Sequence, residues 1–190
     1  MKKIIGIVGE KGAGKETFGN FLRDFLQEKK KTFFRIHSSD VLIETLAIWK
    51  IPTTRENLQK LPVAMEKMFG RGALTRAVKS RIEASDNDVI VFDGVRWHSD
   101  AEMIRSFGTI GTLVYITASK EIRYGRLKER KEKVEEFNLS YKQFCEEENA
   151  PTEAHIREIG MCADFIIENY GSVDKLKEEV RVFCKEVIFS

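Results

Sequence analysis

The chain has 190 residues, of which 42% are hydrophobic and 33% charged, and its formal net charge is +2. This length and composition are typical of one globular domain, here residues 1–190, and the charge gives no case for general nucleic-acid binding. No apolar run approaches the ~20 residues that cross a bilayer, and the N-terminal run is too short for a signal peptide. We therefore expect a cytoplasmic protein without a membrane partner. We expect it to be a monomer or a homodimer.

Short apolar runs alternate with longer amphipathic stretches along the chain, which predicts βα units and a parallel sheet. The runs are apolar at nearly every position, as strands covered on both faces are. The expected strands are residues 3–8, 32–36, 89–92, 113–116 and 164–167. The expected helices are residues 15–28, 39–49, 55–68, 73–84, 100–106, 120–133, 141–148, 153–161 and 173–188.

A glycine-rich loop joins the first strand to the first helix. Its glycines let backbone N–H groups turn inward, and the helix directs its positive end to the same point. Lys15 then reaches the β- and γ-phosphates of a nucleotide. This is the P-loop pattern, and its strand–turn–helix context disfavours a turn that binds nothing. The residues expected to bind the nucleotide here are Gly9, Gly12, Ala13, Gly14, Lys15, Glu16 and Thr17.

The position after Lys15 departs from that pattern. A Ser or Thr that holds Mg²⁺ usually follows the lysine, whereas here Glu16 follows and Thr17 comes one residue later. Three arrangements are open: Thr17 takes the hydroxyl role, Glu16 holds the metal through water, or phosphates and water hold most of the ion.

Residues 37–86, between the second and third strands, form too long a stretch for a structureless loop. They predict helices inserted at the carboxyl edge of the sheet, where ligands bind in open α/β folds. Asp40 is expected to face the resulting second pocket, with helix N-capping as the alternative. Arg55 is the first residue of a helix in this insertion. Its side chain is equally expected to face the pocket or to lie on the surface.

The third strand runs into Asp93, Gly94, Val95 and Arg96. A carboxylate at a strand's carboxyl end beside a P-loop can orient Mg²⁺ through water or accept a proton from an attacking group. The alternative for Asp93 is a cap on the glycine turn. Arg96 presents a rigid fork suited to a phosphate or carboxylate.

Arg123, Arg126 and Arg130 share one face of the helix expected at residues 120–133. Arginines stabilise the charge that spreads over a transferred phosphoryl group, so we expect Arg126 and Arg130 to be catalytic. Interleaved glutamates make a solvated salt-bridge face the alternative.

Residues 126–150 are rich in Lys and Glu and are expected to close over the site as a lid that excludes water. Their one isolated apolar cluster is Phe137, Leu139, Tyr141 and Phe144.

Neither the cysteines nor the histidines show metal-ligand spacing. We therefore expect buried or half-buried free thiols, and the sequence does not indicate a zinc site. These residues are Cys145, Cys162, Cys184, His37, His98 and His155.

Taken together, these motifs resemble the P-loop nucleotide kinases, that is, the nucleoside monophosphate kinases and the dephospho-coenzyme A kinases, over nearly the whole chain. Gly14-Lys15-Glu16-Thr17 is similar to the Gly-Lys-Asp-Thr variant of deoxynucleoside monophosphate kinases. Residues 54–61 are similar to the arginine-bearing acceptor helix of this group. Residues 163–172 are similar to a segment of dephospho-coenzyme A kinases near the adenine of ATP, which implies that Asn169 binds the nucleotide.

The resemblance implies a three-layer α/β/α P-loop kinase fold with a five-stranded parallel sheet, inserted acceptor-binding helices and a short lid. It implies ATP and Mg²⁺ as cofactors and phosphoryl transfer to a small nucleotide, most directly a (deoxy)nucleoside monophosphate. A dephospho-coenzyme A kinase and a P-loop ATP-binding or ATPase regulatory protein are the alternatives. The expected roles are catalysis by Lys15, Asp93, Arg126 and Arg130, nucleotide binding also by Arg126, acceptor binding by Asp40, Arg55 and Arg96, and Mg²⁺ binding by Thr17 and Asp93 through water.

Overall fold

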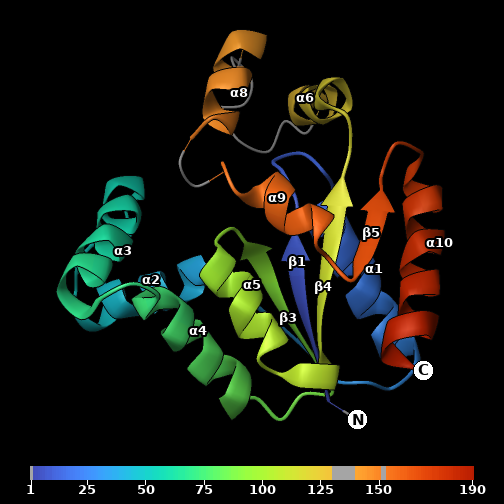
Figure 1. Ribbon diagram of the computed structural model, residues 1–190, viewed down its shortest axis with the longest axis horizontal. Coiled ribbons are helices and arrows are strands. Elements are labelled where there is room, and N and C mark those ends of the chain that lie inside the picture. The colour runs from blue at the N-terminus through green and yellow to red at the C-terminus, as the bar shows by residue number, and fades with distance from the viewer. Residues whose placement is uncertain (1, 130–139, 151–152) are drawn as a thin grey trace.

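The computed structural model describes residues 2–129, 140–150 and 153–190. In these residues five parallel strands form one sheet in the order β2–β3–β1–β4–β5 (Figure 1). The strands are β1 (Lys3–Val8), β2 (Phe33–His37), β3 (Val89–Val95), β4 (Gly111–Thr117) and β5 (Phe165–Glu168). β1 pairs with β3 and β4 and is buried at every position, which explains its unbroken apolar sequence. The predicted five-stranded parallel sheet is confirmed.

The helices follow the predicted order with small differences at their ends. They are α1 (Lys15–Glu28), α2 (Ser38–Ile48), α3 (Arg55–Phe69), α4 (Ala73–Ala84), α5 (His98–Arg105), α6 (Lys120–Glu129), α8 (Tyr141–Glu148), α9 (Ile156–Met161) and α10 (Val173–Phe183). Residues 153–155 form a turn, so α9 begins later than predicted. The expected last helix ends as a π-helical turn, Cys184–Ile188.

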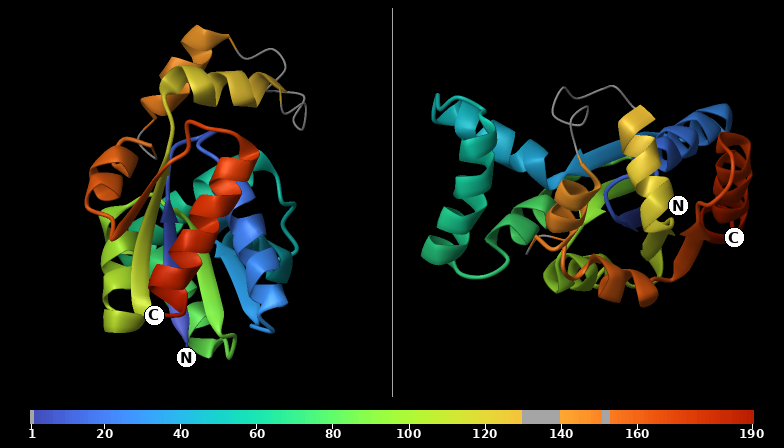
Figure 2. Two further views of the ribbon diagram at one scale, coloured as in Figure 1. Left: turned by 90° about the vertical axis from the view of Figure 1, so that its right-hand side faces the viewer. Right: turned by 90° about the horizontal axis from the view of Figure 1, so that it is seen from above.

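Helices cover both faces of the sheet, which gives the three layers predicted (Figure 2). Side chains along β1 alternate between the faces, because successive residues of a strand point to opposite sides. Ile4 and Val8 pack with α4, α5 and α9, whereas Ile5 and Ile7 pack with α1 and α10. Phe18 of α1 and Phe183 of α10 meet edge to face with ring centroids 5.4 Å apart.

Helices α2, α3 and α4 lie between β2 and β3 in the chain, as predicted for the insertion at residues 37–86. They share a small apolar cluster centred on Leu42, Leu46 and Leu61. Helix α3 stands away from the sheet, and α2 and α4 connect it to the rest of the domain (Figures 1 and 2). The insertion therefore forms an arm beside the carboxyl edge of the sheet.

Helices α6 and α8 lie above the carboxyl edge of the sheet and pack on each other through Leu127 and Phe144 (Figure 1). Arg130, Phe137 and Leu139 fall outside the described residues, so the lid expected at residues 126–150 stays a prediction. All three cysteines are free thiols. Cys184 is buried and Cys145 half-buried, as expected, whereas Cys162 is exposed. Among the described helices, none has both the length and the apolar character needed to span a membrane.

Candidate active site

The loop between β1 and α1 has the backbone shape of a phosphate cradle. Gly12 and Gly14 have φ angles of 81° and 104°, a region that side chains disfavour. A Cβ atom at Gly9 would collide with the carbonyl oxygen of Ile116, and one at Gly14 would collide with the side chain of Asn169. The glycines are therefore required both by the curl of the loop and by its close neighbours.

Lys15 lies inside this loop. Its Nζ donates to the carbonyl oxygens of Gly9 at 2.6 Å and Glu10 at 2.9 Å. Burial lowers the pKa of Lys15, and the negative charge of Asp93 partly opposes that effect. Both hydrogen-bonded carbonyls are neutral, so a phosphate oxygen would be a stronger partner for the ammonium group.

Asn169 and Arg126 close the loop from the side of β5. Asn169 is buried, and its Nδ2 donates to the carbonyl oxygen of Ala13 at 2.9 Å. Arg126 Nη2 donates to the carbonyl oxygen of Asn169 at 2.9 Å, whereas its Nη1 is buried without a hydrogen-bond partner among the described residues. Burial lowers the pKa of Arg126. A guanidinium nitrogen left unpaired beside a phosphate cradle fits an anionic ligand.

Glu10 is a carboxylate of the loop that sequence analysis gave no role. Its Oε1 accepts a hydrogen bond from the hydroxyl of Tyr115, and its Oε2 is buried without a hydrogen-bond partner among the described residues. The pKa of Tyr115 is raised to about 12, mainly by burial and secondly by this hydrogen bond. The pair fixes the underside of the loop to β4.

Asp93 lies within β3 and not after its end, because the strand continues to Val95. The pairing of β1 with β3 shifts register there, and Gly94 has a φ of 107°. The buried Asp93 carboxylate accepts hydrogen bonds from Nε, at 3.0 Å, and Nη2 of Arg35 on β2. An ion pair therefore holds the Asp93 carboxylate, which does not cap the glycine turn, the alternative considered from the sequence. Arg35 was missed, although it is a single charge in an otherwise apolar run.

One cavity of ≈ 2000 Å³ joins the P-loop to the inserted helices. Ligand pockets usually measure about 300–1,000 Å³, so this space is large enough for two ligands. The P-loop half is lined by Gly12, Gly14, Lys15, Glu16, Thr17, Arg126 and Asn169. The other half has an apolar wall of Leu42, Leu58, Pro62, Val63 and Leu74.

Arg96 lines this second half and its guanidinium pairs with Glu153. Its backbone N–H donates at 3.1 Å to Asp100 Oδ2, which also accepts from the N–H of Trp97 at 3.2 Å. Desolvation raises the pKa of the buried Asp100. Sequence analysis missed Asp100, which fixes the turn that carries Arg96 and Trp97.

The structure does not bring two expected acceptor residues into the cavity wall. Asp40 Oδ2 accepts the backbone N–H of His37 at 2.6 Å and so caps α2, the alternative considered from sequence. Arg55, the exposed first residue of α3, is not among the described residues that line the cavity. Arg130 falls outside the described residues.

The arginines expected on one face of α6 have different surroundings. Arg126 lines the cavity, whereas Arg123 is buried and binds the carbonyl oxygens of Ala118 at 3.0 Å and Lys11 at 3.2 Å. Arg123 also pairs with Glu148 of α8. This buried arginine therefore ties the P-loop to α6 and α8.

The P-loop half of the cavity also offers groups suited to Mg²⁺. Thr17, Glu16 and Asp93 all line it, and they supply a hydroxyl and two carboxylates. Mg²⁺ prefers such hard oxygen donors and usually keeps several waters. The donor set fits the ion, and each of the three arrangements considered for Glu16 and Thr17 stays open.

Comparison with known proteins shows the fold. No protein-family model matches the chain. Its structure is similar to shikimate kinase from Bacteroides thetaiotaomicron, with a TM-score of 0.60, 13% identity and 97% of each chain covered. It is also similar to a gluconokinase from Sinorhizobium meliloti, with a TM-score of 0.56, 14% identity, and 99% of this chain and 94% of that one covered. The chain has the P-loop kinase fold.

Sequence relatives extend over the whole domain but carry names without an activity. A UPF0200 protein of Saccharolobus solfataricus is 29% identical over 188 residues, which cover 97% of this chain and 92% of that protein. A UPF0200 protein of Methanococcus vannielii is 23% identical over 190 residues, which cover 99% and 98%. The P-loop kinase fold is thus confirmed, whereas the nucleotide-kinase subgroup that the motifs resemble stays a prediction.

Proposed function

We propose that this protein is an ATP-dependent phosphotransferase that acts on a small nucleotide, most directly a (deoxy)nucleoside monophosphate. The observation that carries the proposal is the single cavity that joins the P-loop to a second wall built by the inserted helices. A protein that only binds or hydrolyses ATP needs space for the nucleotide and water. A second wall of this size provides for an acceptor.

The P-loop half would bind ATP. The curled backbone at Gly12 and Gly14 offers N–H groups to the phosphates, and Lys15 offers a positive charge. Arg126, with one unpaired nitrogen, would stabilise the charge that develops on the γ-phosphoryl oxygens. Asn169 acts by positioning, because it holds the Ala13 carbonyl and Arg126 together.

The acceptor half combines charge with an aromatic surface. Arg96 and Arg71 both line it, and a guanidinium group suits an acceptor phosphate. Trp97 lines the same region and is 41% exposed, so its ring is accessible to a nucleobase. Guanidinium groups that can donate hydrogen bonds to a phosphate, beside an exposed aromatic ring, fit a nucleoside monophosphate.

In the proposed reaction an acceptor oxygen forms a bond to the γ-phosphorus while the bond to the β–γ bridging oxygen breaks, and ADP leaves. Asp93, oriented by Arg35, would receive the proton of a hydroxyl or protonated acceptor. Mg²⁺, held by Thr17 and Asp93 through water, would neutralise phosphate charge. Lys15 and Arg126 would hold the phosphates in line.

A dephospho-coenzyme A kinase is the second candidate, and the apolar wall of the acceptor half favours it. Leu42, Leu58, Pro62, Val63 and Leu74 line this wall, and an extended, largely apolar acceptor arm would bury against such a surface. In that case the attacking group is a sugar hydroxyl, and the proton acceptor at Asp93 becomes essential.

An acceptor panel tests the proposal. ADP release from Mg²⁺-ATP is measured with each (deoxy)nucleoside monophosphate, with dephospho-coenzyme A, with shikimate, with gluconate and with no acceptor, and products are identified by mass spectrometry. We expect a nucleoside diphosphate product from the monophosphate acceptor, and little ADP without acceptor. ADP release at the same rate in every arm would instead establish an ATPase. Phosphorylation of dephospho-coenzyme A alone would establish the second candidate.

A further inference from the structure

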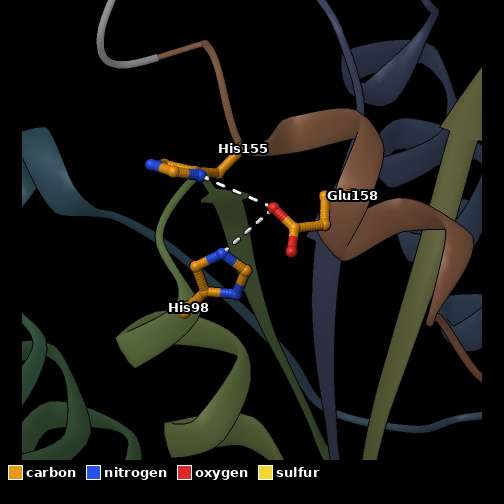
Figure 3. Close-up of side chains that lie close together, drawn as sticks. All are labelled: His98, His155 and Glu158. Carbon is orange, nitrogen blue, oxygen red and sulfur yellow. Dashed lines mark ion pairs between the residues drawn. The ribbon is translucent and has the colours of Figure 1, made fainter.

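Two histidines and a glutamate, drawn from two distant segments of the chain, meet at the rim of the cavity. His98 is the first residue of α5, His155 directly precedes α9, and Glu158 lies in the first turn of α9. Both imidazole rings turn toward the same carboxylate oxygen (Figure 3). Sequence spacing gave no sign of this cluster, because the sheet, not the local chain, brings α5 and α9 together.

The distances within the cluster are those of a metal site. Glu158 Oε2 lies 3.4 Å from His98 Nε2 and 3.7 Å from His155 Nδ1. The three donor atoms all lie within 4.8 Å of one another. In a tetrahedral zinc site with bonds of about 2.0–2.1 Å, ligand atoms are ~3.4 Å apart. Small side-chain rotations would therefore place all three atoms around one ion.

The backbone under the cluster is fixed. Ile156 and Ile159 anchor α9 in the core, with 2% and 3% of their surfaces exposed. The buried Asp100 holds the turn before α5 and also accepts a hydrogen bond from Thr75 at 2.9 Å. Ligands carried on rigid elements lose little freedom when they bind an ion.

An ion pair alone explains this arrangement poorly. Glu158 and His98 have 68% and 51% of their side-chain surfaces exposed, and exposed ion pairs contribute little stability. Two imidazole nitrogens directed at one carboxylate oxygen form instead a donor set that suits Zn²⁺ and its first-row neighbours. Mg²⁺ prefers oxygen donors only, so the cluster is distinct from the expected Mg²⁺ site.

We propose that His98, His155 and Glu158 bind a divalent first-row transition-metal ion, with Zn²⁺ as the preferred ion. Three protein ligands leave a coordination position open, as in zinc sites that bind an external ligand. His98 and His155 line the cavity, as do Trp97 and Glu153, so a ligand of the metal would enter from the cavity. An oxygen anion, such as a phosphate or carboxylate, is the ligand class that this position would take.

Zinc titration of the full chain tests the site independently of any kinase activity. Isothermal titration in excess Mg²⁺ should show one Zn²⁺ per chain. His98→Ala and Glu158→Gln should each weaken binding at least about tenfold, the lower limit seen even when outer-shell partners of a metal are lost. His37→Ala, which changes the one other histidine, is the matched control and should bind as the unaltered chain does. Thermal unfolding of each variant shows that it is folded.

Co²⁺ identifies the ligands directly. We expect a visible Co²⁺ spectrum without a thiolate charge-transfer band, and we expect inorganic phosphate to change it. No zinc binding by the folded chain, or a thiolate band that Cys162→Ser removes, would overturn the site. A Co²⁺ spectrum that phosphate leaves unchanged would overturn the open position. Each outcome holds whether or not the acceptor panel reveals a kinase.

Discussion

At the scale of single residues, Lys15 shows how the site opposes stability. Burial lowers its pKa, so the folded state binds this proton less readily than the unfolded state does. The ammonium therefore costs stability at every pH below its folded pKa, and the cost disappears as the pH rises above the unfolded value. Under the proposed function, the charge is retained because it binds phosphate.

Lys15→Met should separate these two effects. We expect phosphoryl transfer to fall at least about 100-fold, as after loss of one electrostatic donor, while the melting temperature stays unchanged or rises. ADP release and calorimetry at pH 7 measure the two quantities, with Lys67→Met on the exposed surface of α3 as the control. Turnover within a few-fold of the unaltered protein would rule out the P-loop role of Lys15.

Arg96→Lys keeps the charge at the acceptor half but removes the guanidinium fork. We expect the acceptor KM to rise on the order of tenfold, because a hydrogen bond to a charged group contributes about 1.5 kcal/mol. ATP affinity measured without acceptor should not change. Arg105→Lys, whose side chain binds the Cys162 carbonyl outside the cavity, is the control. Equal losses of ATP and acceptor binding would move Arg96 to the donor half.

Sequence reasoning at this scale found residues that act through local spacing. Lys15 and its glycines were predicted because one turn of chain contains the whole cradle. Arg35 was missed because its partner Asp93 lies on a neighbouring strand, and the histidine–glutamate cluster was missed for the same reason. Asp40 was expected in the pocket, whereas its carboxylate accepts the His37 backbone N–H. A carboxylate after a strand has the same sequence pattern whether it caps a helix or binds a ligand.

At the scale of elements, a buried ion pair holds α8 in addition to its apolar contact through Phe144. Glu148 pairs with Arg123 and also with Lys120, at 2.9 Å, and its side chain is only 15% exposed. Glu148→Gln removes the negative charge and leaves Arg123 poorly paired, which should cost about 1–3 kcal/mol locally. We expect faster amide hydrogen exchange in α8, with α10 unchanged in the same sample. Glu146→Gln, on the exposed side of α8, should change neither helix.

Asp88 joins the starts of β2 and β3. Its carboxylate accepts the backbone N–H of Thr32 at 2.9 Å and the Lys31 ammonium at 2.9 Å. The pKa of Asp88 is lowered to about 2, mainly by the hydrogen bond from the Thr32 backbone and secondly by the one from Lys31. Because the pKa of Asp88 in the folded protein lies below its value in the unfolded chain, the charged carboxylate stabilises the folded state. This stabilisation is present above about pH 4 and is lost as the pH falls toward 2.

Asp88→Asn should therefore unfold at lower urea concentration than the unaltered protein at pH 7, and the difference should shrink as the pH falls below 4. Urea titrations at pH 7, 5, 4 and 3 measure it. Asp86→Asn, on the exposed loop before β3, should track the unaltered protein throughout. A difference that persists undiminished at pH 3 would show that the Asp88 charge does not stabilise the strand pair.

Element types were predictable because burial on both faces leaves an apolar run in each of the three central strands, β1, β3 and β4. Their ends were less so. β3 extends past Phe92 through Asp93 and Gly94, since the register shift beside β1 accommodates a charged residue and a glycine that the apolar pattern excludes. The turn at residues 153–155 was included in the predicted helix because helix ends are not sharply marked in a sequence.

At the scale of the whole molecule, the three layers and the inserted helices followed from the order of the elements. The size of the cavity did not, because it depends on how far α3 stands from the sheet. The small cluster of Leu42, Leu46 and Leu61 holds α2 and α3 together. Side-chain contacts within the arm, which the order of the elements does not reveal, thus help to hold α3 beside the cavity.

The contact between Asn169 and Ala13 joins positions 156 residues apart. A ribosome synthesises the P-loop among the first residues, yet the loop lacks this support until Asn169 has emerged from the exit tunnel. A growing chain therefore carries the recognisable motif long before it carries a finished nucleotide pocket. Under the proposed function, ATP would meet the supported loop only in chains that have been translated past β5.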